Sequence, residues 1–147
     1  MTVLATLEET SFATSFLELL RGGVSYTIDT LREAATAEPG SRILFILGTD
    51  QFAELASWRE PQAIVEEFGL IVVRRPGTDF RAAADRMPGF VGEAIAKGRV
   101  VEAPMEPFPL SATEIRAKVS RSESIEGLVA PHVAQYIQQY GLYRPGG

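Results

Sequence analysis

The segment RILFIL, Arg42–Leu47, decides the fold, because a near-continuous apolar run is typical of a strand buried on both faces of a parallel sheet. GLIVV, Gly69–Val73, repeats this pattern, and RVVEA, residues 99–103, predicts a short third strand. Helical patterns separate these strands along the chain. Alternating strands and helices predict an α/β fold, with a Rossmann-like open parallel sheet and helices on both faces.

The segments around the strands carry helix signals, with apolar residues three and four apart. The predicted helices cover residues 26–38, 50–58, 61–68, 81–87, 89–98 and 130–143. The last helix places Val133, Ile137 and Tyr140 on one face and ends at Gly141. Upstream, SFLELL at residues 15–20 predicts a short strand closed by a Gly-Gly turn.

Length and composition limit the classes of protein. A chain of 147 residues is expected to form a single domain, residues 1–147. A net charge of -5 argues against a general nucleic-acid partner, and no apolar run reaches the ~18 residues of a membrane span. The absence of cysteine excludes disulfides and thiol chemistry and fits a cytoplasmic protein. The single histidine, His132, excludes any site that needs two imidazoles.

The stretch LSATEIR, residues 110–116, allows two interpretations. Ser111 and Glu114 form a capping box that starts a helix, and this needs no ligand. The same helix start also presents N–H groups to an anion, and Thr113 and Arg116, three apart, form one polar patch beside it. Ile115 and Val119 are expected to anchor the helix to the sheet.

Polar residues follow each predicted strand, where open α/β sheets bind their ligands. They are Gly48, Thr49 and Asp50, then Arg74 and Arg75, then Ser111, Thr113 and Arg116. Each group also has a plain structural interpretation: Thr49 or Asp50 as a helix N-cap, the arginines as solvated charges. Trp58 is either ordinary core or a stacking platform for a flat ring. The shared position of the three polar groups, each following a predicted strand, favours a ligand site.

Five ordered motifs resemble those of a known family. They are GGVSYTIDTL, FILGTDQF with SWREP beyond it, VVRRPG, LSATEIR and VAPHVAQYIQQYGLY. From about Ser15 to Tyr143 the chain is similar to the C-terminal two-thirds of bacterial nicotinate-nucleotide adenylyltransferase. The resemblance implies a nucleotidyltransferase fold and transfer of AMP from ATP to nicotinate mononucleotide. The products would be nicotinate adenine dinucleotide and pyrophosphate, in NAD biosynthesis.

The resemblance also implies roles for individual residues. Tyr26, Thr27 and Trp58 would surround the nicotinate ring, Asp50 would contact the nucleotide, and Arg75 would face the mononucleotide phosphate. The family's ISSTxIR helix start, which binds the ATP phosphates, corresponds to Ser111, Thr113 and Arg116, with Ala112 replacing one serine. Mg²⁺ would arrive with ATP rather than on protein ligands.

One family motif, GxFDPxHxGH, does not occur in this sequence. We therefore assign no catalytic residue in this chain, expect the domain to be N-terminally incomplete without its first βαβ part, and expect little turnover by the chain alone. It is then a truncated enzyme, half of a two-chain enzyme, or a non-catalytic pseudoenzyme used as a binding module. A flavodoxin-like domain is the alternative outside the family. Loss of the first strands would expose an apolar sheet edge and favour self-association, and His132 is expected at the surface.

Overall fold

The computed structural model describes residues 1–103 and 110–144, and the loop predicted at residues 104–110 lies almost wholly outside them. The chain divides into two compact units. One unit, Leu17–Phe108, contains the sheet and is called the sheet unit below. The other combines Met1–Phe16 with Pro109–Gly147 and is called the helical unit. Each is described by itself.

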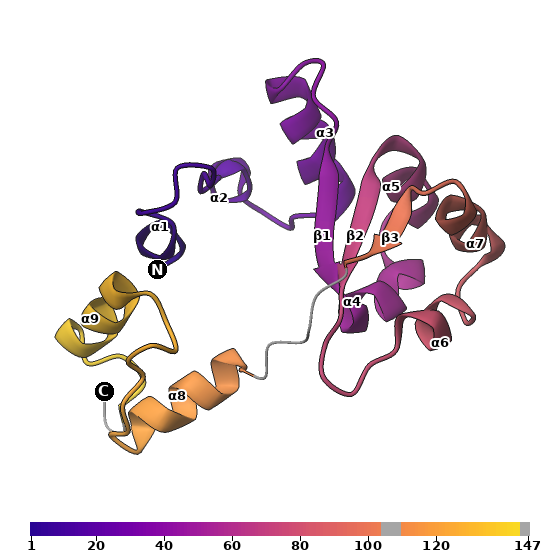
Figure 1. Ribbon diagram of the computed structural model, residues 1–147. Helices are drawn as coiled ribbons and strands as arrows, with labels where there is room; N and C mark the ends of the chain where they lie inside the picture. Colours follow the sequence, from indigo (N-terminus) through magenta and orange to yellow (C-terminus); the bar gives the residue numbers. More distant parts are fainter. Residues whose placement is uncertain (104–109, 145–147) are drawn as a thin grey trace. The chain divides into compact units, whose positions relative to one another are not determined.

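The sheet unit is built on three parallel strands in the order β1-β2-β3 (Figure 1). They are β1 Leu44–Gly48, β2 Gly69–Val73 and β3 Val100–Glu102. The register aligns Leu44 with Gly69 and Gly48 with Val73, so β1 and β2 end level with each other. The prediction of an α/β fold with a parallel sheet is confirmed.

Helices precede and connect the strands of this unit. They are α2 Leu17–Arg21, α3 Thr27–Ala37, α4 Thr49–Glu54, the 3₁₀ helix η1 Leu55–Ser57, α5 Pro61–Glu67, α6 Phe80–Ala84 and α7 Gly89–Ala96. Pro61 occupies the first turn of α5, and Gly98 follows α7 with a φ of 66°, both as predicted. Among the described residues of the chain, no helix is long and apolar enough to cross a membrane.

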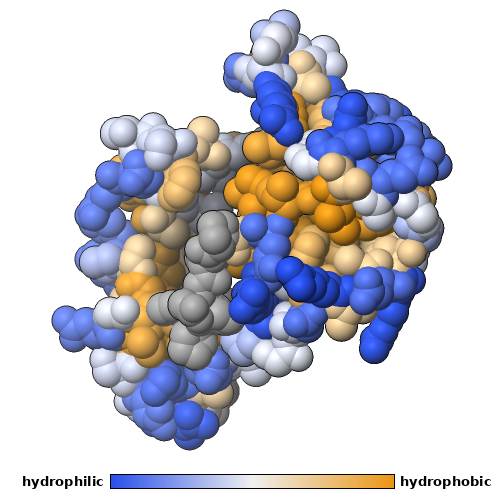
Figure 2. Space-filling model, turned by 45° about the vertical axis from the view of Figure 1, so that its right-hand side comes forward, coloured by the Kyte–Doolittle hydropathy of each residue, from blue (hydrophilic) through white to orange (hydrophobic). Residues whose placement is uncertain are grey.

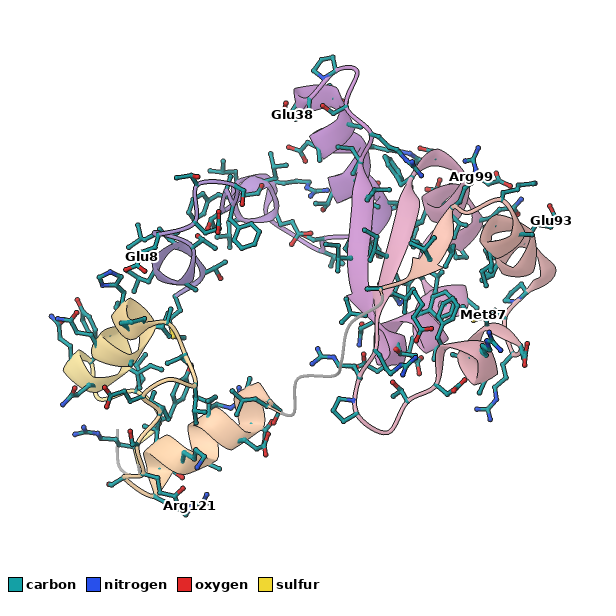
Figure 3. The ribbon with its side chains drawn as sticks, in the orientation of Figure 1. Glu8, Glu38, Met87, Glu93, Arg99 and Arg121 are labelled. Carbon is teal, nitrogen blue, oxygen red and sulfur yellow. The ribbon has the colours of Figure 1, made fainter. Side chains whose placement is uncertain are left out.

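The main core lies between one face of the sheet and these helices. Leu47, Leu70 and Val72 pack there with Ile28 of α3, Phe52 of α4 and Ile64 of α5. Phe52 stacks on Phe80 with ring centroids 5.3 Å apart, and Met87, between α6 and α7, packs at the margin (Figure 3). The crossover segments therefore fix the strand ends on a well-packed base.

The prediction that β1 is buried on both faces is wrong, although it holds for most of β2. Leu44 and Ile46 share the face opposite to Leu47, and they are 42% and 62% exposed. Hydrophobic residues are visible at the surface in Figure 2. An apolar run shows that both faces of a strand are apolar, but it does not show whether both are covered.

The strand predicted at residues 15–20 is also wrong, because this segment forms helix α2. Leu19 and Leu20 are 79% and 83% exposed, so burial does not dictate their conformation. Polar contacts hold α2 to α3 instead: Arg21 donates to Thr30 at 2.7 Å, and Thr30 donates to Glu18 at 2.8 Å. The predicted turn after it is present, with φ of 68° at both glycines.

The helical unit contains α1 Thr2–Ala5, α8 Ala112–Ser120 and α9 Pro131–Gln139. Its core joins Ile115 of α8 to Val133 and Ile137 of α9, with Val119 packed beside them. Ile115 and Val119, expected to anchor α8 to the sheet, anchor it instead to this cluster of the helical unit.

His132 in α9 and Tyr140, directly after α9, both lie at the surface of the helical unit. Tyr140 was predicted on the face of Val133 and Ile137, but it is 60% exposed. It follows the last residue of α9, and its ring packs on the Tyr136 ring with centroids 4.5 Å apart. His132 is at the surface as expected, with its Nε2 3.5 Å from a carboxylate oxygen of Glu8.

Candidate functional site

The ends of β1 and β2 bring Asp50 and Arg75 together. Asp50 lies in the first turn of α4, directly beyond β1, and its Oδ1 is 3.8 Å from Nε of Arg75, beyond β2. Both side chains are about half exposed, so neither charge is buried. A carboxylate and a guanidinium at the carboxyl ends of parallel strands form the polar rim at which such sheets bind ligands.

Gly48, beneath this pair, has a role that its position in the sequence did not reveal. A Cβ atom at position 48 would overlap Oδ1 of Asp50 and lie 2.9 Å from Nε of Arg75. The φ of Gly48 is -75°, so the backbone conformation itself does not require glycine. Glycine is needed here for space, because any side chain would displace both charged groups.

Thr49 is a structural residue at this rim. The predicted N-cap role of Thr49 or Asp50 is wrong, because Gly48 is the N-cap of α4 and no side chain caps that helix. The Thr49 side chain is buried, and its hydroxyl donates to the Val73 carbonyl oxygen at 3.1 Å. It thereby joins the start of α4 to the end of β2 and keeps the two strand ends in register.

The two adjacent arginines have different partners. Arg74 donates to Glu102 of β3 through Nε at 3.0 Å and Nη2 at 2.9 Å, and it therefore links neighbouring strands. Arg75 instead lies beside Asp50. Of the pair, Arg75 is the residue whose charge is presented at the rim between β1 and β2.

Tyr26 and Thr27 lie at the start of α3. This helix runs antiparallel to β1, so its first turn is the end of the helix nearer to the carboxyl end of that strand (Figure 1). Glu38, which follows its last residue, is labelled at the far end in Figure 3. Tyr26 is 41% exposed and Thr27 is half-buried, so both residues are accessible to a ligand.

Trp58 is half-buried, as a stacking residue requires, and it is not sealed in the core. It follows η1, and its ring meets Phe45 of β1 edge-on, with centroids 6.0 Å apart at 64°. This packing fixes one edge of the indole and leaves part of the side chain in contact with solvent. The geometry suits a platform for a flat ring.

Arg59 connects the Trp58 loop to the start of α3. No motif or periodicity marks this residue in the sequence, apart from its place beside Trp58. Its guanidinium carbon lies 4.7 Å from the centre of the Tyr26 ring, and its Nη1 is 3.4 Å from Oδ2 of Asp29. A cation above an aromatic ring at this distance is a cation–π contact. Tyr26 and Trp58, 32 positions apart in sequence, are thus linked through one side chain.

Arg32 makes a second connection between the same elements. It donates to Glu60, which precedes α5, at 3.0 Å and to Glu67, the last residue of α5, at 2.9 Å through Nε. These hydrogen bonds lower the pKa of Glu67 and raise that of Arg32. Helix α3 is therefore held to both ends of α5 by one guanidinium.

In the helical unit, α8 begins with the predicted capping box. The Ser111 hydroxyl accepts the Glu114 N–H at 3.1 Å, and the Ser111 N–H donates to the Glu114 carboxylate at 2.8 Å. Arg116 donates to the Thr113 hydroxyl at 3.2 Å, and both side chains are exposed. The predicted cap and the predicted polar patch are both present on this helix.

The chemistry that these groups offer is binding and charge neutralisation. Arginines, hydroxyls and a helix N-terminus suit phosphate oxygens, and Trp58 with Tyr26 suits an aromatic ring. Within residues 1–103 and 110–144, no three His, Cys, Asp or Glu side chains are grouped to hold a metal ion. No protein-family model matches the chain.

Two curated relatives share most of this sequence. A probable nicotinate-nucleotide adenylyltransferase of Bordetella petrii is 39% identical over 136 residues, covering 92% of this chain and 67% of the relative. A second, from Bordetella avium, is 38% identical over 129 residues, covering 87% of this chain and 62% of the relative. The chain thus spans about two thirds of the length of these relatives.

A solved structure shares the fold. Nicotinic acid mononucleotide adenylyltransferase of Plasmodium falciparum, complexed with APC, superposes with a TM-score of 0.65. The superposition covers 94% of this chain and 70% of that one, at 20% sequence identity. At this identity the match supports the parallel-sheet fold alone.

Proposed function

This chain belongs to the nicotinate-nucleotide adenylyltransferase family, and from that premise we propose that it binds nicotinate mononucleotide and ATP. The reaction transfers AMP from ATP to the mononucleotide phosphate, giving nicotinate adenine dinucleotide and pyrophosphate in NAD biosynthesis. Such a transfer depends on holding two phosphates in line while their charge is neutralised, with little covalent participation by the protein. The residues at the sheet rim and at the start of α8 are of the types that this task needs.

The nicotinate mononucleotide site is proposed on the sheet unit. Trp58 and Tyr26 would enclose the pyridine ring, and Thr27 would lie near its carboxylate. Arg75 would face the mononucleotide phosphate, and Asp50 would contact the nucleotide while keeping Arg75 in place. The single observation that carries this proposal is the Asp50–Arg75 pair over Gly48, where the smallest residue leaves room for two charged groups.

The ATP phosphates are proposed to bind at the start of α8, through Ser111, Thr113 and Arg116. Support comes from the exposed Arg116–Thr113 hydrogen bond beside a helix N-terminus, which favours anions through its N–H groups and its dipole. Mg²⁺ is proposed to come bound to ATP, where it would neutralise phosphate charge during the transfer. No side chain of this chain is assigned to it.

Isothermal titration calorimetry tests the binding proposal directly. The wild-type chain should bind nicotinate mononucleotide with a Kd between about 1 μM and 1 mM, the range of typical KM values, because KM equals Kd where chemistry is slow. Arg75→Ala should weaken this binding, whereas Arg81→Ala, at an exposed arginine of α6, should not. No heat of binding with the wild type at millimolar ligand would contradict the proposal.

A turnover assay separates the enzyme from the alternative, a non-catalytic binding module of the same fold. We propose that the 147-residue chain by itself makes nicotinate adenine dinucleotide far more slowly than the Bordetella petrii relative, because this sequence lacks the two histidines of GxFDPxHxGH. Each missing transition-state donor typically costs ~10²-fold in rate. Turnover equal to that of the relative would refute this proposal.

Self-association through the β1 edge is also proposed. In the described sheet β1 pairs only with β2, it carries no charged residue, and Ile46 is 62% exposed. Uncharged apolar edges of this kind pair readily with other strands. Ile46→Lys should shift the sedimentation profile toward monomer, whereas Gln51→Lys should not. Identical profiles for Ile46→Lys and the wild type would contradict this assignment.

A further inference from the structure

The loop of Trp58, Arg59 and Glu60 adopts a conformation that ordinary residues rarely take. Glu60 has φ 51° and ψ 53°, in the left-handed region that favours glycine. Such a backbone persists only where the surrounding structure enforces it, and it is frequent at ligand sites. Two arginine side chains connect this loop to α3.

Arg59 contributes the first contact, and it reaches across to α3. Its guanidinium lies over the Tyr26 ring at 4.7 Å and its Nη1 is 3.4 Å from the Asp29 carboxylate. The side chain of Arg59 is 51% exposed, so it is not placed there by core packing. It is placed by the ring on one side and by the carboxylate on the other.

Arg32 contributes the second contact, from the middle of α3. Its Nη2 bonds Glu60 at 3.0 Å, and Nη2 and Nε both bond Glu67 at the far end of α5. The left-handed residue itself is thus tied to α3. The two residues that follow Trp58 are therefore both tied to α3, Arg59 through its own side chain and Glu60 through Arg32.

We propose that Arg59 is a positioning residue of the nicotinate site, which ties the loop that carries Trp58 to the Tyr26 ring and the Asp29 carboxylate at the start of α3. The proposal rests on the proposed function for its ligand. The contacts of Arg59 with Tyr26 and Asp29, called the clamp below, are present in the free protein. Arg59 acts through the Tyr26 ring and through the loop backbone, and it does not contact the substrate. Without Arg59 the loop that carries Trp58 loses these two contacts with α3, and the indole keeps its packing against Phe45 and the core.

The first test uses Trp58 as a reporter, because it is the single tryptophan of the sequence. In the free protein, Arg59→Ala should raise the acrylamide quenching constant of Trp58 above the wild-type value, because the loop loses its contacts with Tyr26 and Asp29. Arg59→Lys keeps the cation and should restore about half of the protection. Arg86→Ala, at an exposed arginine outside the loop, is the matched control.

The second test measures ligand affinity by calorimetry on the same variants. Arg59→Ala should weaken nicotinate mononucleotide binding about two- to fivefold, Arg59→Lys should recover part of it, and ATP affinity should stay unchanged. Unchanged quenching in Arg59→Ala overturns the clamp. If binding is weaker in that case, Arg59 contacts the ligand directly. More quenching with unchanged mononucleotide affinity overturns its role at the site. If the wild type binds no mononucleotide, the proposed function fails, while the quenching comparison still decides whether the clamp exists.

Discussion

The sheet unit and the helical unit differ in how completely they bury their cores. In the sheet unit Ile28, Phe52 and Ile64 are wholly inaccessible to solvent. In the helical unit the buried side chains of Ile115, Val133 and Ile137 keep 4–8% of their surface exposed. The proposed ring site is therefore built on a fully buried core, whereas the proposed ATP-phosphate site lies on a helix held by a less completely buried core and by its capping box.

The largest expected effect is on the free energy of unfolding. The comparison is between the same substitution, isoleucine to alanine, in the core of each unit. Ile64→Ala removes a fully buried side chain and should lower the free energy of unfolding by about 4 kcal/mol, since Ile→Ala substitutions in cores cost about 2–5 kcal/mol. Ile137→Ala should cost about 2 kcal/mol, near the lower limit. Urea denaturation followed by circular dichroism measures both. Equal losses would show that the two cores are equally well packed.

Two substitutions on α8 should separate binding from folding. Arg116→Ala should weaken ATP binding by about tenfold or more, the equivalent of one charge-assisted hydrogen bond of about 1.5–3 kcal/mol. An exposed arginine adds little to stability, so the unfolding curve should hardly change.

Glu114→Ala should do the reverse, costing about 1 kcal/mol of stability through the lost half of the capping box, with ATP affinity largely kept. Calorimetry and thermal unfolding measure the two quantities on each variant. If Arg116→Ala leaves ATP affinity unchanged, α8 has only a capping box and no phosphate site.

Gly48→Ala should affect the sheet rim more than the fold. The atoms that a new methyl group would meet belong to the side chains of Asp50 and Arg75, which are about half exposed and can move away from it without disturbing the core. The Asp50–Arg75 pair would be displaced, and nicotinate mononucleotide affinity should fall about three- to tenfold, or about 0.7–1.4 kcal/mol. Gly92→Ala, on α7 with open space around it, is the control. A loss of folding in Gly48→Ala with intact binding would contradict this role.

The smallest expected effect is the pH dependence of the Arg32–Glu67 contact. Hydrogen bonds from Arg32 lower the pKa of Glu67, so this carboxylate favours the folded state at pH values above its unfolded pKa of about 4.3. That contribution disappears as the pH falls through the lower folded-state pKa. Arg32→Ala should raise the pKa of Glu67, as measured by NMR titration of its side-chain carbons. An unchanged pKa would show that the contact does not persist in solution.

The sequence predicted the elements whose signals are local. The apolar runs of β1 and β2, Pro61 at the start of α5 and the Ser111–Glu114 capping box are each read from a few neighbouring residues, and each is present. The strand predicted at residues 15–20 was an error because apolar residues suggested a buried strand there, whereas Leu19 and Leu20 are exposed. Exposure of Leu44 and Ile46 was missed because coverage of a strand depends on distant segments.

The candidate site was predictable in its residue types and less so in its contacts. Resemblance and position at strand ends selected Asp50 and Arg75, which the fold brings together. The tertiary roles of Gly48, Thr49 and Arg59 depend on atoms far away in sequence: a shared space, a carbonyl of β2 and the ring of Tyr26. Periodicity and capping rules describe neighbours along the chain, so they contain no signal for such contacts.

Fluorescence titration of Trp58 with nicotinate mononucleotide tests the central claim most directly. Trp58 is the single tryptophan and is half-buried against Phe45, so its emission reports on this one place in the sheet unit. We predict saturable quenching by the mononucleotide, weakened in Arg75→Ala and in Thr27→Val and unchanged in Arg81→Ala. Emission that stays constant up to millimolar nicotinate mononucleotide, in a chain whose circular dichroism shows it folded, would contradict the account.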